Sequence, residues 1–237
     1  MSTPTIVPTR GLTDRATATT VGILYIVGTV AGVSSVVVTG GGIEGPDYLA
    51  DAEALGDSLP LGAALVLVMG LSLAFIPIVV YPVLRRTSER FAVGYVVFRG
   101  AIETTLYIFT AMSWLLLFQL APEYASGAGA SPITGDLLGL MGTTSGTLQT
   151  FVFVIGAVMF YLVLWWARLV PRWLSGWGLL ALIPYFIVAV LGMFDMLDAM
   201  SGTGTAMQMP LALQEMVLAL WLIIRGFSGL KAPVEGG

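Results

Sequence analysis

Six stretches of this chain are apolar over about 20 residues each, which is the length of helix needed to cross the hydrocarbon core of a bilayer. They lie at 19–39, 60–84, 91–120, 147–167, 173–197 and 210–227. Only 10% of the residues are charged, whereas soluble domains contain about 25%. The sequence therefore predicts an all-α fold, a six-transmembrane-helix bundle at 19–227, between a polar N-terminal tail at 1–18 and a short C-terminal tail at 228–237.

The basic residues predict how this bundle is oriented, because Lys and Arg accumulate in short cytoplasmic loops. The loops at 40–59, 121–146 and 198–209 contain neither Lys nor Arg. All basic residues but one fall in the tails, in the alternate loops or at the end of the last span: Arg10, Arg15, Arg85, Arg86, Arg90, Arg168, Arg172, Arg225 and Lys231. We therefore expect a multi-pass protein of the cell membrane with both termini in the cytoplasm.

Two helix boundaries are less clearly marked. The Gly-rich stretch at 131–146 either lengthens the fourth spanning helix or forms a separate short helix at the interface. In the last span, Pro210 suits the first turn of a helix, where its missing N–H is not needed. The sequence predicts that the last helix begins there.

The residue types that are missing exclude several kinds of chemistry. The chain has no Cys and no His, so thiolate nucleophiles, disulfides, His-ligated haem and Cys or His zinc sites are excluded. The acidic loop at 40–59 does not match the EF-hand spacing, and no metal or cofactor is expected. No basic patch supports nucleic-acid binding, which leaves the lipid bilayer as the expected partner. An enzyme is disfavoured because no HExxH motif, paired-Asp motif or nucleophile constellation occurs.

One span contains charges, which are costly inside a membrane. Arg99 and Glu103 lie about 12 Å and 18 Å from the cytoplasmic end of the third span, and each charge costs about 2.5 to 3.5 kcal/mol near the bilayer centre. Their i,i+4 spacing places them on one helical face, which Tyr107 and Thr110 extend. Glu215 in the last span lies at the same expected depth. We therefore predict a charged cluster of Arg99, Glu103 and Glu215 inside the bundle.

The cluster has one positive and two negative formal charges. Since excess charge is unfavourable in a low dielectric, we expect one of the two carboxyls to hold a proton, so that Glu103 and Glu215 titrate as a coupled pair. Three amide or hydroxyl side chains, Gln149, Tyr185 and Gln214, are candidates for further hydrogen bonds within the membrane. The spacing does not decide which of them face the cluster. The candidate polar site is Arg99, Glu103, Tyr107, Gln214 and Glu215.

Three segments carry a resemblance to a known family: "YPVLRRTSERFAVGYVVFRGAIE", "RLVPRWLSGWGLLALIPY" and "LALQEMVLALWLIIRGF". Together they resemble the prokaryotic membrane-protein family called domain of unknown function 4386, over about residues 19–227. The resemblance places these residues on family-like motif positions: Tyr81, Pro82, Arg99, Glu103, Pro171, Trp173, Gln214 and Glu215. It implies a multi-pass membrane fold and no particular activity.

Two functions fit the charged cluster. In the first, the chain is a small transporter or channel-like protein that moves a small molecule or a proton through a midplane site. In the second, it is a non-catalytic scaffold or accessory subunit in which the cluster holds the helices together. A transporter requires a water-accessible cavity that reaches the cluster, whereas a scaffold requires a dry and fully paired one. The sequence identifies neither a substrate nor a protein partner.

Overall fold

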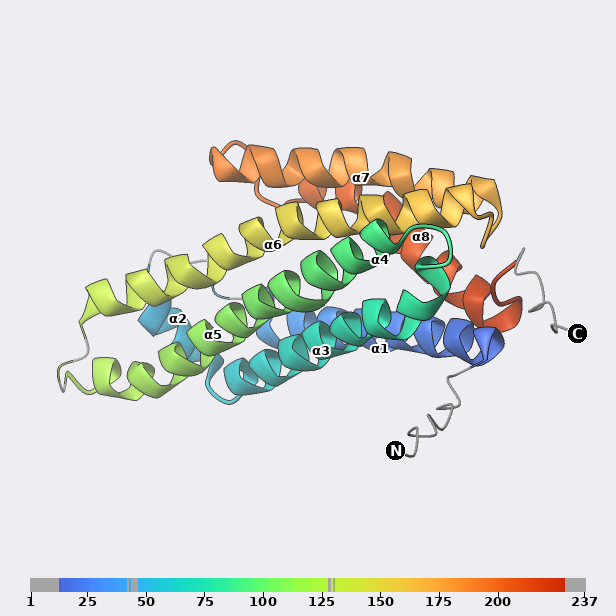
Figure 1. Ribbon diagram of the computed structural model, residues 1–237. Helices are drawn as coiled ribbons and strands as arrows, with labels where there is room; N and C mark the ends of the chain where they lie inside the picture. The colour runs from blue at the N-terminus through green and yellow to red at the C-terminus, as the bar shows by residue number, and fades with distance from the viewer. Residues whose placement is uncertain (1–12, 42, 44–46, 128, 130, 229–237) are drawn as a thin grey trace, which may run out of the picture.

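The computed structural model describes residues 13–41, 43, 47–127, 129 and 131–228. Within these ranges the regular structure is helical (Figure 1). Most of the two predicted tails, with Arg10 and Lys231, lies outside the described residues.

The helices follow one another with short connections. Their bounds are α1 (Asp14–Thr39), α2 (Tyr48–Leu55), α3 (Ser58–Leu84), α4 (Glu89–Tyr95), the π-helical segment η1 (Val96–Ile102), α5 (Glu103–Ala125), α6 (Pro132–Trp166), α7 (Arg172–Met193) and α8 (Gly202–Ile224). Because α4, η1 and α5 form one continuous helix, the described part of the chain has six helices long and apolar enough to cross a membrane. The predicted all-α fold with six spans is confirmed in this respect.

Side-chain caps explain where several helices begin. Thr13 Oγ1 accepts a hydrogen bond from Ala16 N–H at the start of α1, and Ser88 Oγ accepts one from Phe91 N–H at the start of α4. Such caps satisfy amide groups that have no partner within the helix. The Ser88 cap sets the start of the third span at Glu89. This span ends at Ala125, so it extends beyond both ends of the predicted range.

The last two spans differ from prediction at the end of α7 and at the start of α8, which one loop connects. The predicted fifth span reaches residue 197, but α7 ends at Met193, and Asp195 has a left-handed φ of 56° that an α-helix does not contain. The expectation that the last helix begins at Pro210 is wrong. Ser201 Oγ accepts the Gly204 N–H and starts α8 at Gly202, which leaves Pro210 inside the helix.

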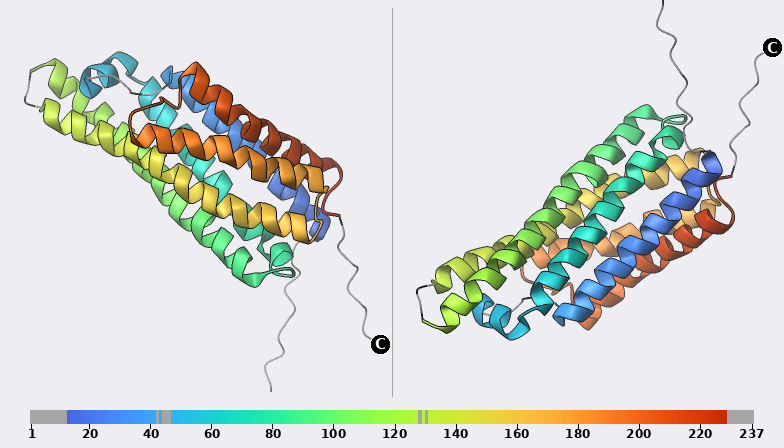
Figure 2. Two further views of the ribbon diagram at one scale, coloured as in Figure 1. Left: turned by 90° about the horizontal axis from the view of Figure 1, so that it is seen from above. Right: turned by 90° about the horizontal axis from the view of Figure 1, so that it is seen from below.

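The stretch at 131–146 lengthens the fourth spanning helix, so α6 contains 35 residues. Its glycines allow a close approach of the short helix α2, because a Cβ at Gly139 would overlap the Tyr48 ring. This packing compensates for the low helix propensity of glycine. Figure 2 shows that α5 and α6 reach beyond the other long helices at this end of the bundle.

The six long helices form a closed ring. Each packs against two neighbours in the order α1, α3, α5, α6, α7, α8, and α8 packs back on α1. The first pair is close because Gly28 is small, and a Cβ there would lie 3.0 Å from Leu73. Near the ends of α1 and α8, the Arg15 guanidinium donates to the Ile223 carbonyl oxygen. In this ring, α5 and α8 stand opposite each other across the bundle axis.

Candidate functional site

The charged cluster lies on the axis of the ring. Arg99 belongs to the π-helical segment and Glu103 begins α5, one helical turn further along. Arg99 Nη1 donates to both oxygens of Glu103, at 3.1 Å and 3.3 Å. Arg99 Nη2 lies 3.7 Å from Glu215 Oε1 on α8. Arg99, which we expect to cluster with Glu103 and Glu215, therefore pairs with both carboxylates, and the pair with Glu215 joins opposite sides of the ring.

The two carboxylates differ in their surroundings. The Glu103 side chain is fully buried, whereas the Glu215 side chain is 18% exposed. No hydrogen bond from the described residues reaches Glu215, whose ion pair with Arg99 is longer than the one that Glu103 makes. Glu103 is thus the fixed counter-ion of Arg99, and Glu215 retains hydrogen-bonding capacity.

The guanidinium is held by an aromatic ring as well as by carboxylates. Its Cζ atom lies 4.5 Å from the centroid of the Phe153 ring on α6, a distance at which the negative face of the ring attracts a cation. The Arg99 Nε atom is buried without a hydrogen-bond partner among the described residues. Arg99 therefore contacts α6 and α8 as well as α5, although it is not saturated with hydrogen bonds.

A cavity of about 230 Å³ opens beside the cluster. Its walls come from all six long helices: Gly28, Thr29, Met69, Leu73, Arg99, Glu103, Tyr107, Gln149, Phe153, Tyr185, Gln208, Leu211, Ala212 and Glu215. Since one water occupies about 30 Å³ in the liquid, the cavity has room for several waters or for one small solute. The cavity extends from the cluster toward the end of the bundle whose described loops lack Lys and Arg.

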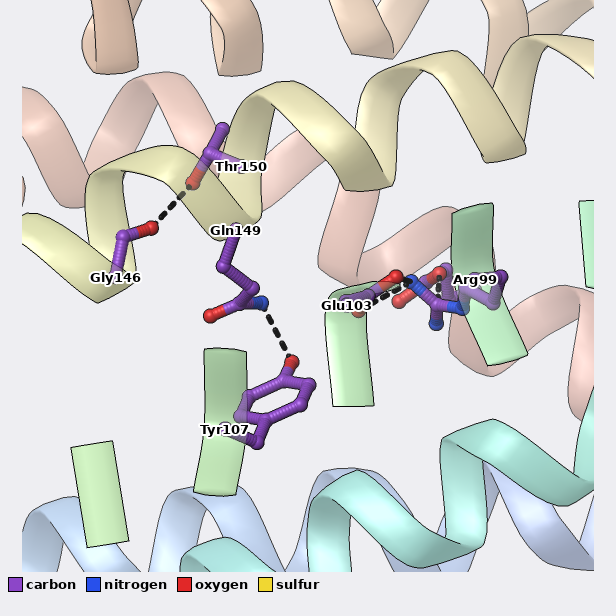
Figure 3. A network of polar contacts seen from close by, with 7 residues as sticks. Arg99, Glu103, Tyr107, Gly146, Gln149 and Thr150 are labelled. Atoms are coloured by element: carbon purple, nitrogen blue, oxygen red, sulfur yellow. Dashed lines mark hydrogen bonds and ion pairs between the residues drawn. The ribbon is translucent and has the colours of Figure 1, made fainter. Parts of the chain in front are cut away.

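Two polar side chains line the wall beyond Glu103. Gln149 Nε2 on α6 donates to the Tyr107 hydroxyl oxygen at 2.7 Å (Figure 3). Thr150, the next residue on α6, donates its hydroxyl to the Gly146 carbonyl oxygen at 3.3 Å, so that bond stays within its own helix. The polar stripe predicted from Arg99 to Tyr107 thus continues onto a neighbouring helix through Gln149.

Gln214 lies apart from this cavity, although it was predicted in the same polar site. Its side chain is fully buried, accepts a hydrogen bond from the Tyr161 hydroxyl at 2.6 Å and donates to the Leu174 carbonyl oxygen at 3.0 Å. These bonds join α8 to α6 and α7. Both polar atoms of the amide have a protein partner, so Gln214 fixes the helices, and it is not among the residues that line the cavity.

A dry layer closes the bundle on the other side of the cluster, toward the basic loops. Tyr25, Tyr95, Phe160 and Tyr161 are all at most 2% exposed there. The Tyr95 and Phe160 rings stack with their centroids 4.8 Å apart. This layer, called the aromatic floor below, separates the cavity from the end of the bundle that carries Arg85, Arg86, Arg168 and Arg172.

Some cavity residues could not be recognised from the sequence. Gln149 and Tyr185 stand out as polar groups in apolar spans, but their helical faces become readable only when the bounds of α6 and α7 are known. Gln208 lies before the predicted start of the last span, and α8 begins early enough to include it. Phe153 has no signal in the sequence that separates it from other core aromatics.

Comparisons with known proteins identify the family but no activity. Residues 20–226 match the family described as Domain of unknown function (DUF4386). Neither the comparison with curated proteins nor that with solved structures finds a match.

Proposed function

The chain belongs to the DUF4386 family and is a multi-pass helical membrane protein, and because that family description names no activity, we propose a function from the site: a small transporter or channel-like protein. Its pathway runs along the axis of the six-helix ring. The charged cluster of Arg99, Glu103 and Glu215 is its selective site. Tyr107 and Gln149 line the cavity wall on the side of the cluster away from the basic loops.

The observation that carries this proposal is the cavity that reaches the cluster. A cluster that only held helices together would be dry and fully paired, because each buried and unsatisfied polar group is costly. Glu215 is instead partly accessible, and Arg99 Nε has no partner among the described residues. Ionisable groups that face a hydrated space inside a bundle are typical of ion and substrate pathways.

The aromatic floor supports a gated pathway. The cavity extends from the cluster toward one end of the ring only, while Tyr25, Tyr95 and Tyr161 are buried on the other side. A transporter exposes its site to one side at a time, so a layer that closes the site on one side only is the expected arrangement for one such state. Transport would require these aromatic side chains to separate.

We further propose that the basic end of the bundle faces the cytoplasm and that the protein resides in the cell membrane. The described loops and adjoining helix ends on that side carry Arg85, Arg86, Arg90, Arg168 and Arg172, whereas the described loops at the other end carry no basic residue. Reporters inserted near residues 88 and 170 should then be cytoplasmic, and tags at 47–57 should be accessible from outside intact cells. Outside access to either arginine-bearing loop would contradict this orientation.

A non-catalytic scaffold remains the second candidate, and one observation favours it. Arg99 and Glu103 form a fully buried pair within one continuous helix. Arg99 also contacts Phe153 on α6 and Glu215 on α8, as a structural link between helices would. The two candidates differ in whether water and solutes reach Glu215.

The lack of cysteine in the chain makes this difference testable. Thr29 lines the cavity, and Ile23 is an exposed apolar residue on α1 that does not line it. In sealed vesicles, a membrane-impermeant thiol reagent should modify T29C from the side of the loop between α7 and α8 and should leave the control I23C unmodified, because a thiolate forms only in contact with water.

The same variant tests transport. Vesicles containing T29C should take up protons or at least one solute from a panel of inorganic ions, amino acids and organic cations, and modification of the thiol should block that uptake. An inert T29C thiol, together with vesicles that move neither protons nor any member of the panel, would contradict a transport function and leave the scaffold.

A further inference from the structure

We propose that Glu215 exchanges a proton for a small organic ammonium ion in this cavity, which rests on the transport function proposed above and names its substrate class. The ion is an alkyl ammonium of a few carbon atoms. Glu103 keeps its charge as the partner of Arg99, and Glu215 alternates between its protonated and its ammonium-bound form.

The division of roles follows from the geometry of the two carboxylates. Glu103 also borders the cavity, but its side chain is completely buried and both of its oxygens accept from one Arg99 nitrogen, so a second cation there would compete with Arg99. Glu215 lies 3.7 Å from Arg99, lines the cavity and has an accessible side chain. Of the two, only Glu215 can bind a ligand without breaking the buried pair.

The balance of charge selects a cation over an anion. With both carboxylates ionised, the cluster has one positive and two negative charges. An anion in the cavity would meet the carboxylate of Glu215, while the two Arg99 Nη atoms are already engaged and its flat face covers Phe153. A singly charged cation neutralises the excess, as a proton on Glu215 does.

The walls indicate an organic ion. Apolar and aromatic side chains surround much of the space, among them Met69, Leu73, Phe153 and Leu211. An alkyl chain gains free energy by leaving water for such a surface, whereas a small inorganic cation requires several oxygen ligands. Amides are also present: Gln149 donates its Nε2 hydrogen to Tyr107, so its carbonyl oxygen is left to accept an N–H of the ammonium group. The volume of about 230 Å³ limits the ion to a small one.

The exchange step is balanced without any other reactant. The O–H bond of the protonated Glu215 carboxyl breaks, and its proton passes to water in the cavity. The ammonium ion then forms an ion pair with the carboxylate, and no electron is transferred. Each ion bound therefore releases up to one proton.

Other titratable groups surround Glu215, and none of them replaces it in this role. Arg99 and Glu103 face it from the π-helical segment and α5 as a fixed pair. The remaining groups are tyrosines on α1, α4, α5, α6 and α7: Tyr25, Tyr95, Tyr107, Tyr161 and Tyr185. Tyrosine hydroxyls carry no charge near pH 7, so only a carboxyl can release the proton in that range.

The test uses the whole protein in detergent micelles, in a weakly buffered solution with a pH-sensitive dye. Ethylammonium chloride should release protons from the wild type, and sodium chloride at the same concentration should not. Where Glu215 is protonated, the apparent affinity for ethylammonium should rise by up to about tenfold per pH unit, because proton and ligand exclude each other. The variant E215Q should lose this release, and E123Q, which changes an exposed carboxylate outside the cavity, should retain it.

Each outcome decides the question. No proton release from the wild type, equal release with sodium, or full release from E215Q would each overturn the exchange at Glu215. The wild-type comparison needs no variant, so a folding defect in E215Q cannot obscure it. If the exchange fails while T29C is still accessible and its modification still blocks uptake, the transport function stands with another substrate.

Discussion

The two halves of the ring, on either side of the charged cluster, are packed differently. Toward the basic loops, α1 and α6 contribute the large side chains Tyr25, Phe160 and Tyr161, which fill the axis. Away from the basic loops, a cavity remains, and its walls include the small residues Gly28 and Thr29 on α1 and Ala212 on α8. On α1, the change from Tyr25 to Gly28 within one helical turn removes a large side chain from the axis and contributes to the space on that side.

This contrast places the charges at a boundary. Arg99 and Glu103 lie against the dry half, where an ion pair is little screened, and Glu215 lies against the open half. A structural pair and an accessible carboxylate can thus coexist within 4 Å of each other. The predictions below test whether the two halves differ in energy as they do in packing.

The largest effect is expected when Arg99 is removed and its two carboxylate partners are left in place. The variant R99M leaves Glu103 and Glu215 without a counter-charge and should lower the free energy of unfolding by about 3 to 5 kcal/mol. The triple variant R99M/E103L/E215L replaces the whole set with apolar groups and should stay near the wild type in stability. Equilibrium unfolding in detergent measures both, and a triple variant as unstable as R99M would contradict this account.

Two tyrosine variants compare the halves directly. Y161F removes the donor to Gln214 in the dry half and should cost about 1 to 3 kcal/mol, because the amide oxygen is left buried and unsatisfied. Y107F removes the partner of Gln149, but water in the cavity can replace that hydrogen bond, so the cost should be under about 1 kcal/mol. Equal losses in the same unfolding assay would mean that the halves are equally dry.

A smaller effect is expected at the basic end of the bundle. Arg86 forms a bidentate pair with Asp14 through two 2.8 Å hydrogen bonds, and both side chains are more than one third exposed. D14N should therefore lower stability by less than about 1 kcal/mol, and 1 M salt should remove the difference. A loss that persists in high salt would indicate a role beyond this exposed pair.

The smallest effect is expected at the opposite end, where α2 is attached. The Ala50 N–H and then the Tyr124 hydroxyl donate to Asp47 and lower the pKa of its carboxyl below the usual value. Because the folded pKa is the lower one, this contribution is present above the unfolded pKa and is lost as the pH falls through the folded value. Hydrogen exchange of residues 48–55 should become faster in acid, relative to intrinsic rates, while global unfolding is unaffected.

The variant D47A serves as the control for this pH effect. It should show the faster exchange of α2 already at neutral pH and little further change in acid. If the wild type and D47A respond to acid equally, another group controls α2.

The sequence contains enough information for the spans and for the charge pairing. Apolar length predicts the six helices, and the i,i+4 spacing of Arg99 and Glu103 with the matching depth of Glu215 predicts the cluster. The early start of α6 is not decided by local propensity, since it depends on glycines that pack against Tyr48 from another segment.

The cavity is also beyond local patterns. Gln149 and Gln214 are both amides in spanning helices, yet one borders the cavity and the other is hydrogen-bonded to Tyr161 and Leu174 away from it. Their difference arises from the rotation of α6 and α8 about their axes, which packing against four other helices determines. A sequence without its relatives contains little direct record of that rotation.

The unequal lengths of the helices have a consequence for the surrounding lipid. The continuous helix from Glu89 to Ala125 has 37 residues and α6 has 35, whereas α7 has 22. At 1.5 Å per residue, the two long helices measure about 52 to 55 Å and α7 about 33 Å, against a hydrocarbon thickness of about 30 Å. Tilting alone would have to reach about 55° to hide the long pair, which is beyond the usual range of up to 40°. On the side of α5 and α6 the helices are therefore longer than the hydrocarbon core is thick, whereas the length of α7 matches that thickness. The ends of the two long helices lie among the lipid headgroups or in water.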